Sequence, residues 1–236
     1  MIGPLVIGPP AIRALAALAL CAGVATPVAA QCRLALILGL DISSSVNASE
    51  DILQRQGLAR ALLAPEVAGA VLAGPDWVSL AVFEWSGRDQ QDLLLDWVDL
   101  RTMADLTAAA QTISDSTRSY AEFPTAIGSA LTFAAARLRQ REACPFRTVD
   151  LSGDGIHNDG PGPQVVYRRD RLFDSVTVNG LIITGDHVEL LPHYRTTVLH
   201  GPGAFLEIAD GFADFERAMA RKLLREIGTR MLGAVR

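Results

Sequence analysis

The chain lacks the short motifs that mark the common nucleotide-binding and ester-cleaving enzymes. Its 236 residues contain no Gly-x-Ser-x-Gly elbow, no phosphate-binding loop and no dinucleotide-binding fingerprint. The histidines show no metal-ligand spacing, and we expect ordinary surface or loop positions for His157, His187, His193 and His200. No base lies beside the serines of residues 43–45. We therefore predict that the protein is not an enzyme.

Basic residues are also scarce. The chain has 21 Lys and Arg against 26 Asp and Glu, a formal net charge of −5 at pH 7. Its densest basic run is Tyr167-Arg168-Arg169-Asp170-Arg171, which the solvated face of a helix explains better than a binding patch does. Because nucleic acids require a sizeable basic surface, we expect no nucleic-acid partner.

A membrane span is not expected either, because the apolar run of residues 14–24 is too short to cross a bilayer. This run follows Arg13 and precedes Val28-Ala29-Ala30, the pattern of a secretory signal peptide. We predict a signal peptide over residues 1–30, cleaved after Ala30, and a periplasmic or secreted domain over residues 31–236. Two alternatives stay open: retention of the segment as an anchor, and lipidation of Cys21, although Leu20 before it is larger than usual for such a site.

Cysteine is rare, and cleavage of the signal would leave only Cys32 and Cys144. Each lies just upstream of an apolar segment that is expected to form a strand. If these strands are parallel neighbours, the two sulfur atoms meet at one edge of the sheet. An even pair in an oxidising compartment then predicts a disulfide, with two free buried thiols as the alternative.

The remaining sequence alternates between strand and helix patterns without internal repeats or linkers. Strands are predicted over residues 34–40, 77–85, 92–97, 147–151, 176–184 and 204–208. The second and third are separated by a connection too short for a helix, so they should pair as an antiparallel hairpin. The pattern predicts an α/β fold in one domain: a doubly wound, mostly parallel six-stranded sheet with helices on both faces and one antiparallel edge strand.

The first helix has a clear start signal, because Asn47 and Glu50 are spaced as a capping box. Its predicted inward stripe consists of Ile52, Gln56, Ala59 and Leu63. The three tryptophans, Trp77, Trp85 and Trp97, belong to the predicted hairpin and are expected to pack there, with a position of Trp85 at the rim of the site as the less favoured alternative.

Five oxygen-bearing residues are the candidate site. Asp41, Ser43 and Ser45 alternate at the carboxyl end of the first strand, and Asp154 follows the fourth. In doubly wound folds these two strands are neighbours, and ligands bind beyond their carboxyl ends. Thr125 opens a later helix after the polar loop of residues 114–124. Together these residues predict a site for a small hard cation.

Each of these residues also has a purely structural explanation. Ser43 and Ser45 are suited to helix capping, Thr125 is suited to the N-cap of its helix, and Asp154 is suited to a Gly-Asp-Gly turn. Their joint occurrence on one predicted fold favours the metal site.

The set Asp41-x-Ser43-x-Ser45, Thr125 and Asp154-Gly155 resembles the metal-ion-dependent adhesion site (MIDAS) of von Willebrand factor type A domains. The likeness covers residues 31–236. A closer resemblance is to a bacterial exported family of such domains without an established function, through Ser152-Gly153-Asp154-Gly155, Asn179-Gly180-Leu181 and Gly201-Pro202-Gly203-Ala204-Phe205. One departure is Ser44, where adhesion domains usually have glycine.

The resemblance implies a binding module that holds Mg²⁺, or Mn²⁺ or Ca²⁺ in its place. Three neutral hydroxyls and two carboxylates only just balance a divalent charge, and an open coordination position then favours an Asp or Glu carboxylate of a partner protein. We expect a monomer whose loops 114–124 and 159–163 form the rim of the site. Two alternatives are a metal-dependent hydrolase or phosphatase, for which Ser43 replaces the usual second aspartate, and a metal-independent structural subunit of an envelope complex.

Overall fold

A computed structural model describes residues 1, 3, 29–185 and 189–233 of the chain. Residues 4–28 of the predicted signal peptide and His187 lie outside these ranges. Within the described ranges, no helix is both long enough and apolar enough to cross a membrane.

Six strands form one sheet in the order β3-β2-β1-β4-β5-β6. β1 pairs in parallel with β2 on one side and with β4 on the other, and only β3 is antiparallel to its neighbour. This confirms the predicted fold class, including the antiparallel edge strand. The strands are β1 Cys32–Asp41, β2 Trp77–Trp85, β3 Gln91–Leu100, β4 Phe146–Gly153, β5 Thr177–Thr184 and β6 Leu206–Asp210.

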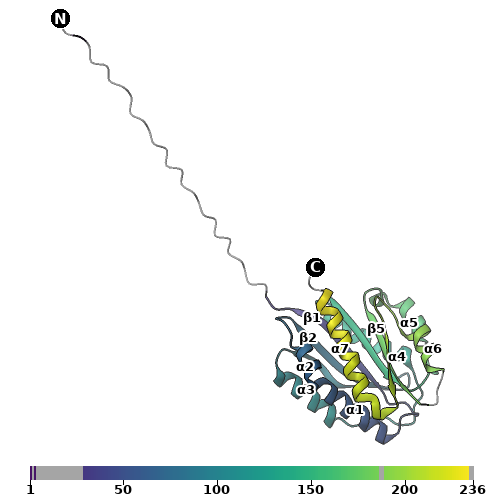
Figure 1. The fold of residues 1–236 in the computed structure, drawn as a ribbon. Coiled ribbons are helices and arrows are strands. Elements are labelled where there is room, and N and C mark those ends of the chain that lie inside the picture. The colour runs from purple at the N-terminus through teal and green to yellow at the C-terminus, as the bar shows by residue number, and fades with distance from the viewer. Residues whose placement is uncertain (2, 4–28, 186–188, 234–236) are drawn as a thin grey trace.

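Helices cover both faces of the sheet (Figure 1). One face packs against α1 Ala48–Leu63, α2 Pro65–Val71, α3 Met103–Asp115 and α7 Phe215–Gly233. The other face packs against α4 Ile127–Leu138, α5 Pro163–Arg169, α6 Leu190–His193 and the π-helical turn η3 Tyr194–Val198. Short 3₁₀ turns complete the chain at η1 Arg139–Arg141, η2 Arg171–Asp174 and η4 Phe212–Asp214.

The central strand β1 explains why this sheet is buried on both sides. All of its residues are buried, and successive side chains enter opposite cores. Leu36 and Leu38 contact the core under α1 and α7, while Ala35 and Ile37 contact the core under α4. A continuous apolar run of this kind is what a strand covered by helices on both faces requires.

Helix α1 begins as predicted but buries a different face. Asn47 caps it, and the Glu50 side chain completes the capping box. Ile52, expected inside, is 53% exposed, whereas Asp51 and Arg55 are buried. Arg55 donates to Asp51 at 2.9 Å and to Glu84 of β2 at 2.5 Å. Of the predicted stripe, Gln56 is also exposed, whereas Ala59 is buried and Leu63 is partly buried against the core. The first half of the stripe was wrong because a buried ion pair occupies positions that apolar periodicity assigns to the surface.

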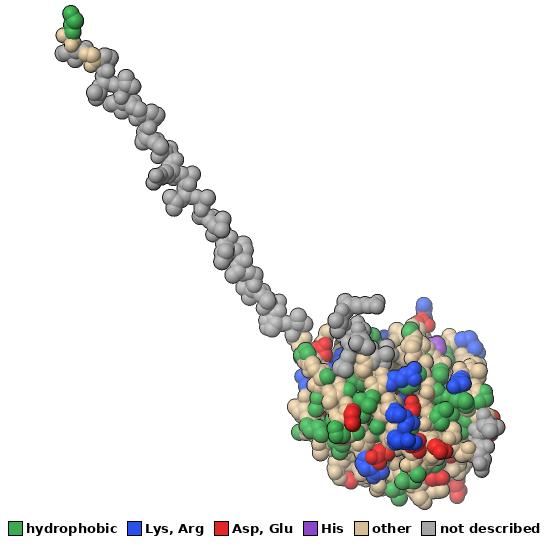
Figure 2. All heavy atoms as spheres, in the orientation of Figure 1, with side chains coloured by type: hydrophobic (Ala, Val, Ile, Leu, Met, Phe, Trp, Pro, Cys, Tyr) green, Lys and Arg blue, Asp and Glu red, His purple; other side chains and the backbone are tan. Residues whose placement is uncertain are grey.

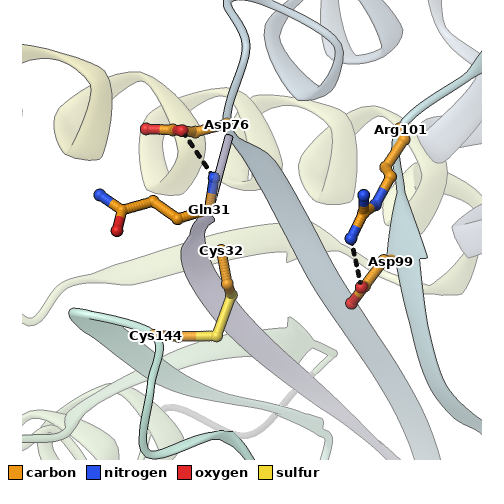
Figure 3. The surroundings of a disulfide bond; sticks show 6 residues. All are labelled: Gln31, Cys32, Asp76, Asp99, Arg101 and Cys144. Atoms are coloured by element: carbon orange, nitrogen blue, oxygen red, sulfur yellow. Dashed lines mark hydrogen bonds and ion pairs between the residues drawn. A yellow bond between two sulfur atoms is a disulfide. The ribbon is translucent and has the colours of Figure 1, made fainter. Parts of the chain in front are cut away.

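The predicted disulfide between Cys32 and Cys144 is confirmed (Figure 3). It joins the start of β1 to the residues before β4, with a Cα–Cα distance of 5.0 Å. Next to it, the backbone N–H of Gln31 donates to Asp76 at 3.0 Å. The bridge therefore lies at the amino ends of these two strands, opposite the predicted site.

Arginines form a stripe over α7 on the face shown in Figure 2, with acidic side chains among them. In and beside this helix, arginines form ion pairs with acidic partners: the pairs are Arg217–Asp214, Arg221–Glu207 and Arg60–Glu216. On α5, the predicted solvated run places Arg168 and Arg169 on the surface.

Trp85 is fully buried in the core, so it does not line the rim of the site.

Candidate metal centre

The loop after β1 turns three oxygen-bearing side chains toward one point. Asp41 and Ser43 are fully buried, and the backbone N–H of Ser43 donates to Asp41 Oδ1 at 2.7 Å. The hydroxyls of Ser43 and Ser45 lie 3.1 Å apart. Ile42 packs into the core instead. The alternation expected from the sequence is therefore present, and Asn47 rather than either serine caps α1.

Asp154 reaches the same point from the loop after β4. The parallel register of β1 and β4 pairs Leu40 with Ser152, which brings the carboxyl ends of the two strands together. Ser45 Oγ then donates to Asp154 Oδ1 at 2.5 Å. Residue 153 must be glycine here, because a Cβ atom at that position would lie 2.6 Å from Asp41 Oδ2.

Thr125 lies ahead of α4 rather than capping it. The N-cap is Ala126, and no side chain caps this helix. Asn158 holds Thr125 from both sides, because it accepts from the Thr125 N–H at 2.8 Å and donates its own N–H to the Thr125 carbonyl at 3.0 Å. Thr125, Ser45 and Asp154 line one cavity of about 210 Å³. The N-cap explanation of Thr125 is thus wrong, and Thr125 lines the cavity instead.

The electrostatics of this cluster suit a cation. Burial and, second, the nearby Asp154 carboxylate raise the pKa of Asp41 to about 7. Asp41 Oδ2 is buried and has no hydrogen-bond partner in the described part of the chain. A divalent cation would neutralise two carboxylates that otherwise repel each other, so the residues fit such an ion.

The ligand set would consist of oxygens of two kinds. Among the described residues, no group of three or more His, Cys, Asp or Glu side chains is arranged to hold a metal. A metal held here would have two carboxylates, Asp41 and Asp154, and would need the hydroxyls of Ser43, Ser45 and Thr125 as further ligands. Oxygen ligands are preferred by Mg²⁺, Ca²⁺ and Mn²⁺.

Arg118 clamps the loop that carries the serines, and sequence reasoning missed it. Its guanidinium donates to the backbone carbonyls of Ile42 at 2.5 Å, Ser43 at 3.1 Å and Val46 at 2.6 Å. The Phe123 carbonyl also accepts from the Ser44 N–H at 2.9 Å. Residues 114 and 115 of the predicted rim loop belong to α3, and the rest of it, residues 116–124, is bound to the candidate site at Arg118 and Phe123. The only available signal was a single arginine within that loop.

The second rim loop, residues 155–162, rests on α4 and on the β2–β3 turn. A Cβ atom at Gly128 would lie 1.8 Å from the Pro161 carbonyl oxygen, so α4 and the loop are in backbone contact. Arg88 in the turn forms an ion pair with Asp159 at 2.5 Å. The cavity is also lined by residues that the sequence did not single out: Ile156, Asn158, Glu189 and Leu190.

His157, within this loop, lies next to His193 of α6. The backbone N–H of His157 donates to His193 Nε2 at 3.2 Å, and burial lowers the pKa of both side chains. Neither lines the cavity that contains Thr125 and Asp154. His157 lies in a loop, as expected, whereas His193 is the last residue of α6, and both side chains are half-buried.

Residues 31–231 match the family described as "Protein of unknown function (DUF1194)". The chain belongs to the DUF1194 family. No curated protein matches it. The DUF1194 chain matches less than half the length of the similar solved structures described below.

Solved structures similar to this DUF1194 protein include a von Willebrand factor type A protein. Proximal thread matrix protein 1 from the mussel byssus, in a structure with a zinc-occupied MIDAS motif, is 19% identical with a TM-score of 0.61 and covers 83% of this chain and 46% of its own. A von Willebrand factor type A protein from Catenulispora acidiphila is 14% identical with a TM-score of 0.59, over 85% and 43% of the two chains. The pilus adhesin SpaC from Lactobacillus rhamnosus GG is 13% identical with a TM-score of 0.56, over 86% and 31%. At these identities the likeness establishes the fold, and the resemblance seen in the sequence is confirmed at that level.

Proposed function

We propose that this DUF1194 protein is a metal-dependent protein-binding module. Asp41, Ser43, Ser45, Thr125 and Asp154 would hold a divalent cation, with Mg²⁺ as the expected ion and Mn²⁺ or Ca²⁺ as substitutes. The observation that carries the proposal is a chain of hydrogen bonds that joins Asp41, Ser43, Ser45 and Asp154, together with a cavity that Ser45 and Asp154 share with Thr125. Within it, Asp41 Oδ2 is buried and has no hydrogen-bond partner in the described part of the chain.

The bound cation would supply an electron-poor centre with a coordination position open to an incoming oxygen. The residues around it determine what enters. Three of the five proposed ligands are neutral hydroxyls, so the cation keeps attraction for a further negative ligand. An Asp or Glu side chain of a partner protein has the matching charge and size. The loops of residues 116–124 and 155–162 would contact the rest of that partner.

Two of the similar structures support this proposal. The mussel byssus protein has been solved with zinc in its MIDAS motif, and SpaC is a pilus adhesin. We extend metal binding and protein binding to this chain on the basis of its own site residues. The proposal includes no catalytic step and treats the protein as a monomer.

We further propose that the protein is exported and cleaved after Ala30. The Cys32–Cys144 disulfide supports this, because such bridges persist in oxidising compartments. The family match also begins at residue 31, directly after the proposed cleavage point. Intact mass of the exported protein should correspond to a chain that starts at Gln31 and lacks two hydrogens relative to its dithiol form.

The decisive experiment is thermal unfolding with and without metal. A cation that binds only the folded state stabilises it by about 2.7 kcal/mol at a hundred times its dissociation constant. For a domain of this size the melting temperature should rise by roughly 5–10 °C over an EDTA-treated sample. Asp154→Ala should remove the rise, whereas Asp174→Ala, an exposed aspartate whose side chain is 68% accessible, should retain it. Identical curves for the wild type with and without Mg²⁺ or Mn²⁺ would contradict the metal site.

Partner binding has its own test. Immobilised protein should capture a partner from an envelope extract in Mg²⁺ and release it in EDTA. Thr125→Ala should weaken capture while the fold is kept, and Thr112→Ala, on the exposed surface of α3, is the matched control. Capture that survives both EDTA and Thr125→Ala would favour a metal-independent structural role.

A further inference from the structure

A tyrosine lies directly beneath the candidate metal centre and has no assigned role. Tyr194 is the first residue of the π-helical turn η3, and its side chain is fully buried. Its hydroxyl has no hydrogen-bond partner within the described residues. Because a buried hydroxyl without a partner is unfavourable, something beyond the contacts of the folded chain must account for it.

Two glycines make room for this side chain. A Cβ atom at Gly180 of β5 would lie 2.9 Å from Tyr194 Cδ1, so the ring packs on the bare backbone of that strand. A Cβ atom at Gly153 of β4 would lie 2.9 Å from the Tyr194 hydroxyl. A glycine inside a strand weakens the strand, and it is often found where another group approaches the backbone closely.

The same glycine also identifies what the hydroxyl faces. The Cβ position at Gly153 is 2.6 Å from Asp41 Oδ2 as well as 2.9 Å from the Tyr194 hydroxyl. These are two buried oxygens on one side of the end of β4, and neither has a hydrogen-bond partner among the described residues. One is a donor and the other is a carboxylate acceptor, so their chemistry is complementary.

The charges around Tyr194 suit a hydroxyl that donates to a carboxylate. Burial, followed by the negative charges of Asp41, Asp154 and Asp150, raises the pKa of Tyr194 well above its usual value. A tyrosine hydroxyl has one O–H group to donate. Tyr167, by contrast, already donates its hydroxyl to the Val198 carbonyl and needs no further partner.

We propose that Tyr194 is a positioning residue of the metal centre: its hydroxyl donates a hydrogen bond to Asp41 Oδ2, directly or through one water, and so fixes the carboxylate for the cation. This inference rests on the proposed metal site. The backbone N–H of Ser43 holds the other oxygen of the same carboxylate. The two donors together leave Asp41 a single orientation, which a metal ligand requires.

The first test compares two tyrosine variants that each lose one oxygen atom. Tyr194→Phe should weaken Mn²⁺ binding, measured by calorimetry, about 10-fold to 100-fold, the range found for outer partners of metal ligands. Tyr167→Phe, which removes a buried hydroxyl that is already paired within the fold, should bind Mn²⁺ as the wild type does. Equal affinities for Tyr194→Phe and the wild type would overturn the inference.

The second test follows the hydroxyl itself and does not depend on how well the Tyr194 variant folds. The chain has three tyrosines, so a sample labelled with ¹³C at Cζ gives three resonances. Tyr120→Phe and Tyr167→Phe assign two of them, and the third belongs to Tyr194. Saturating Mg²⁺ should shift the Tyr194 resonance and leave that of Tyr167 in place.

The outcomes separate this inference from the proposed function. If Mn²⁺ and Mg²⁺ bind the wild type but the Tyr194 resonance does not move, Tyr194 only fills space and the positioning role is wrong. If neither ion binds the wild type, the metal site itself is wrong, and the role of Tyr194 is rejected with it.

Discussion

Replacing Asp41 by asparagine should stabilise the metal-free protein and at the same time abolish its response to Mg²⁺. The Asp41 carboxyl is fully buried, and burial together with Asp154 raises its pKa from 3.8 to about 7. The folded protein therefore holds a proton on Asp41 over a range of pH in which the unfolded chain has released it. In that range the free energy of unfolding falls as the pH rises.

The size of the effect follows from the same shift. Below pH 3.8 the carboxyl is protonated in both states and costs nothing; above pH 7 it is ionised in both, and the full penalty is present. At about 1.4 kcal/mol per pKa unit, the penalty has an upper limit on the order of 4 kcal/mol. Asparagine removes it but buries an amide group beside Tyr194 at a cost of about 1–3 kcal/mol. We expect Asp41→Asn to gain about 1–3 kcal/mol at pH 8 in EDTA, a rise of roughly 2–12 °C in melting temperature.

The assay is urea unfolding of the wild type and Asp41→Asn in EDTA from pH 4 to pH 8, repeated with Mg²⁺ at pH 8. At pH 4 the variant should be no more stable than the wild type, since the carboxyl is then neutral in the folded state and only about half ionised in the unfolded chain, so little of the penalty is present. Asp150, whose pKa burial also raises to about 7, titrates in both proteins, so the difference between them isolates Asp41. With Mg²⁺ only the wild type should gain stability.

Two results would refute this reasoning. If Asp41→Asn is less stable than the wild type at pH 8 without metal, the ionised carboxylate is not under strain. If the difference between the two proteins is the same at pH 4 and pH 8, the effect comes from packing and not from charge.

Three further predictions concern the scaffold around the site. Replacing Cys32 and Cys144 by serine should lower stability by about 3–5 kcal/mol in urea unfolding, because the bridge closes a long loop; a loss under about 1 kcal/mol would contradict this. Arg118→Ala should weaken Mg²⁺ affinity about tenfold in calorimetry, because Arg118 holds the loop that carries the proposed ligands. Circular dichroism should show unchanged secondary structure. Unchanged affinity would show that the loop keeps its shape without Arg118. Lys222, the only lysine of the chain, is fully buried 2.6 Å from Asp150 and 2.8 Å from Glu226. Lys222→Met should therefore cost about 3–5 kcal/mol, and Lys222→Met with Asp150→Asn should recover part of it. A double variant no more stable than the single one would exclude the unpaired Asp150 carboxylate as the cause.

Much of the architecture was determined by the sequence alone. The continuous apolar run before Asp41 is typical of a strand covered by helices on both faces. Most segments between strands are long enough to hold a helix, which favours parallel pairing of the strands. The same reasoning places Asp41 and Asp154 at one end of the sheet and Cys32 and Cys144 at the other. These results depend on periodicity and chain connectivity, which a sequence displays directly.

Only the tertiary structure decided the details that support the site. Arg118 binds carbonyls of the loop after β1 although it lies 76 residues from Ile42, and the Tyr194 hydroxyl lies beside Gly153, as Asp41 Oδ2 does, although the two residues are far apart in sequence. The buried pair of Asp51 and Arg55 in α1 has the appearance of a surface pair in sequence. Polar groups become favourable inside a protein only when a specific distant partner meets them, and local patterns carry no information about that partner. Apolar burial is non-directional and can be read from the sequence, whereas paired burial of polar groups is determined by the folded chain.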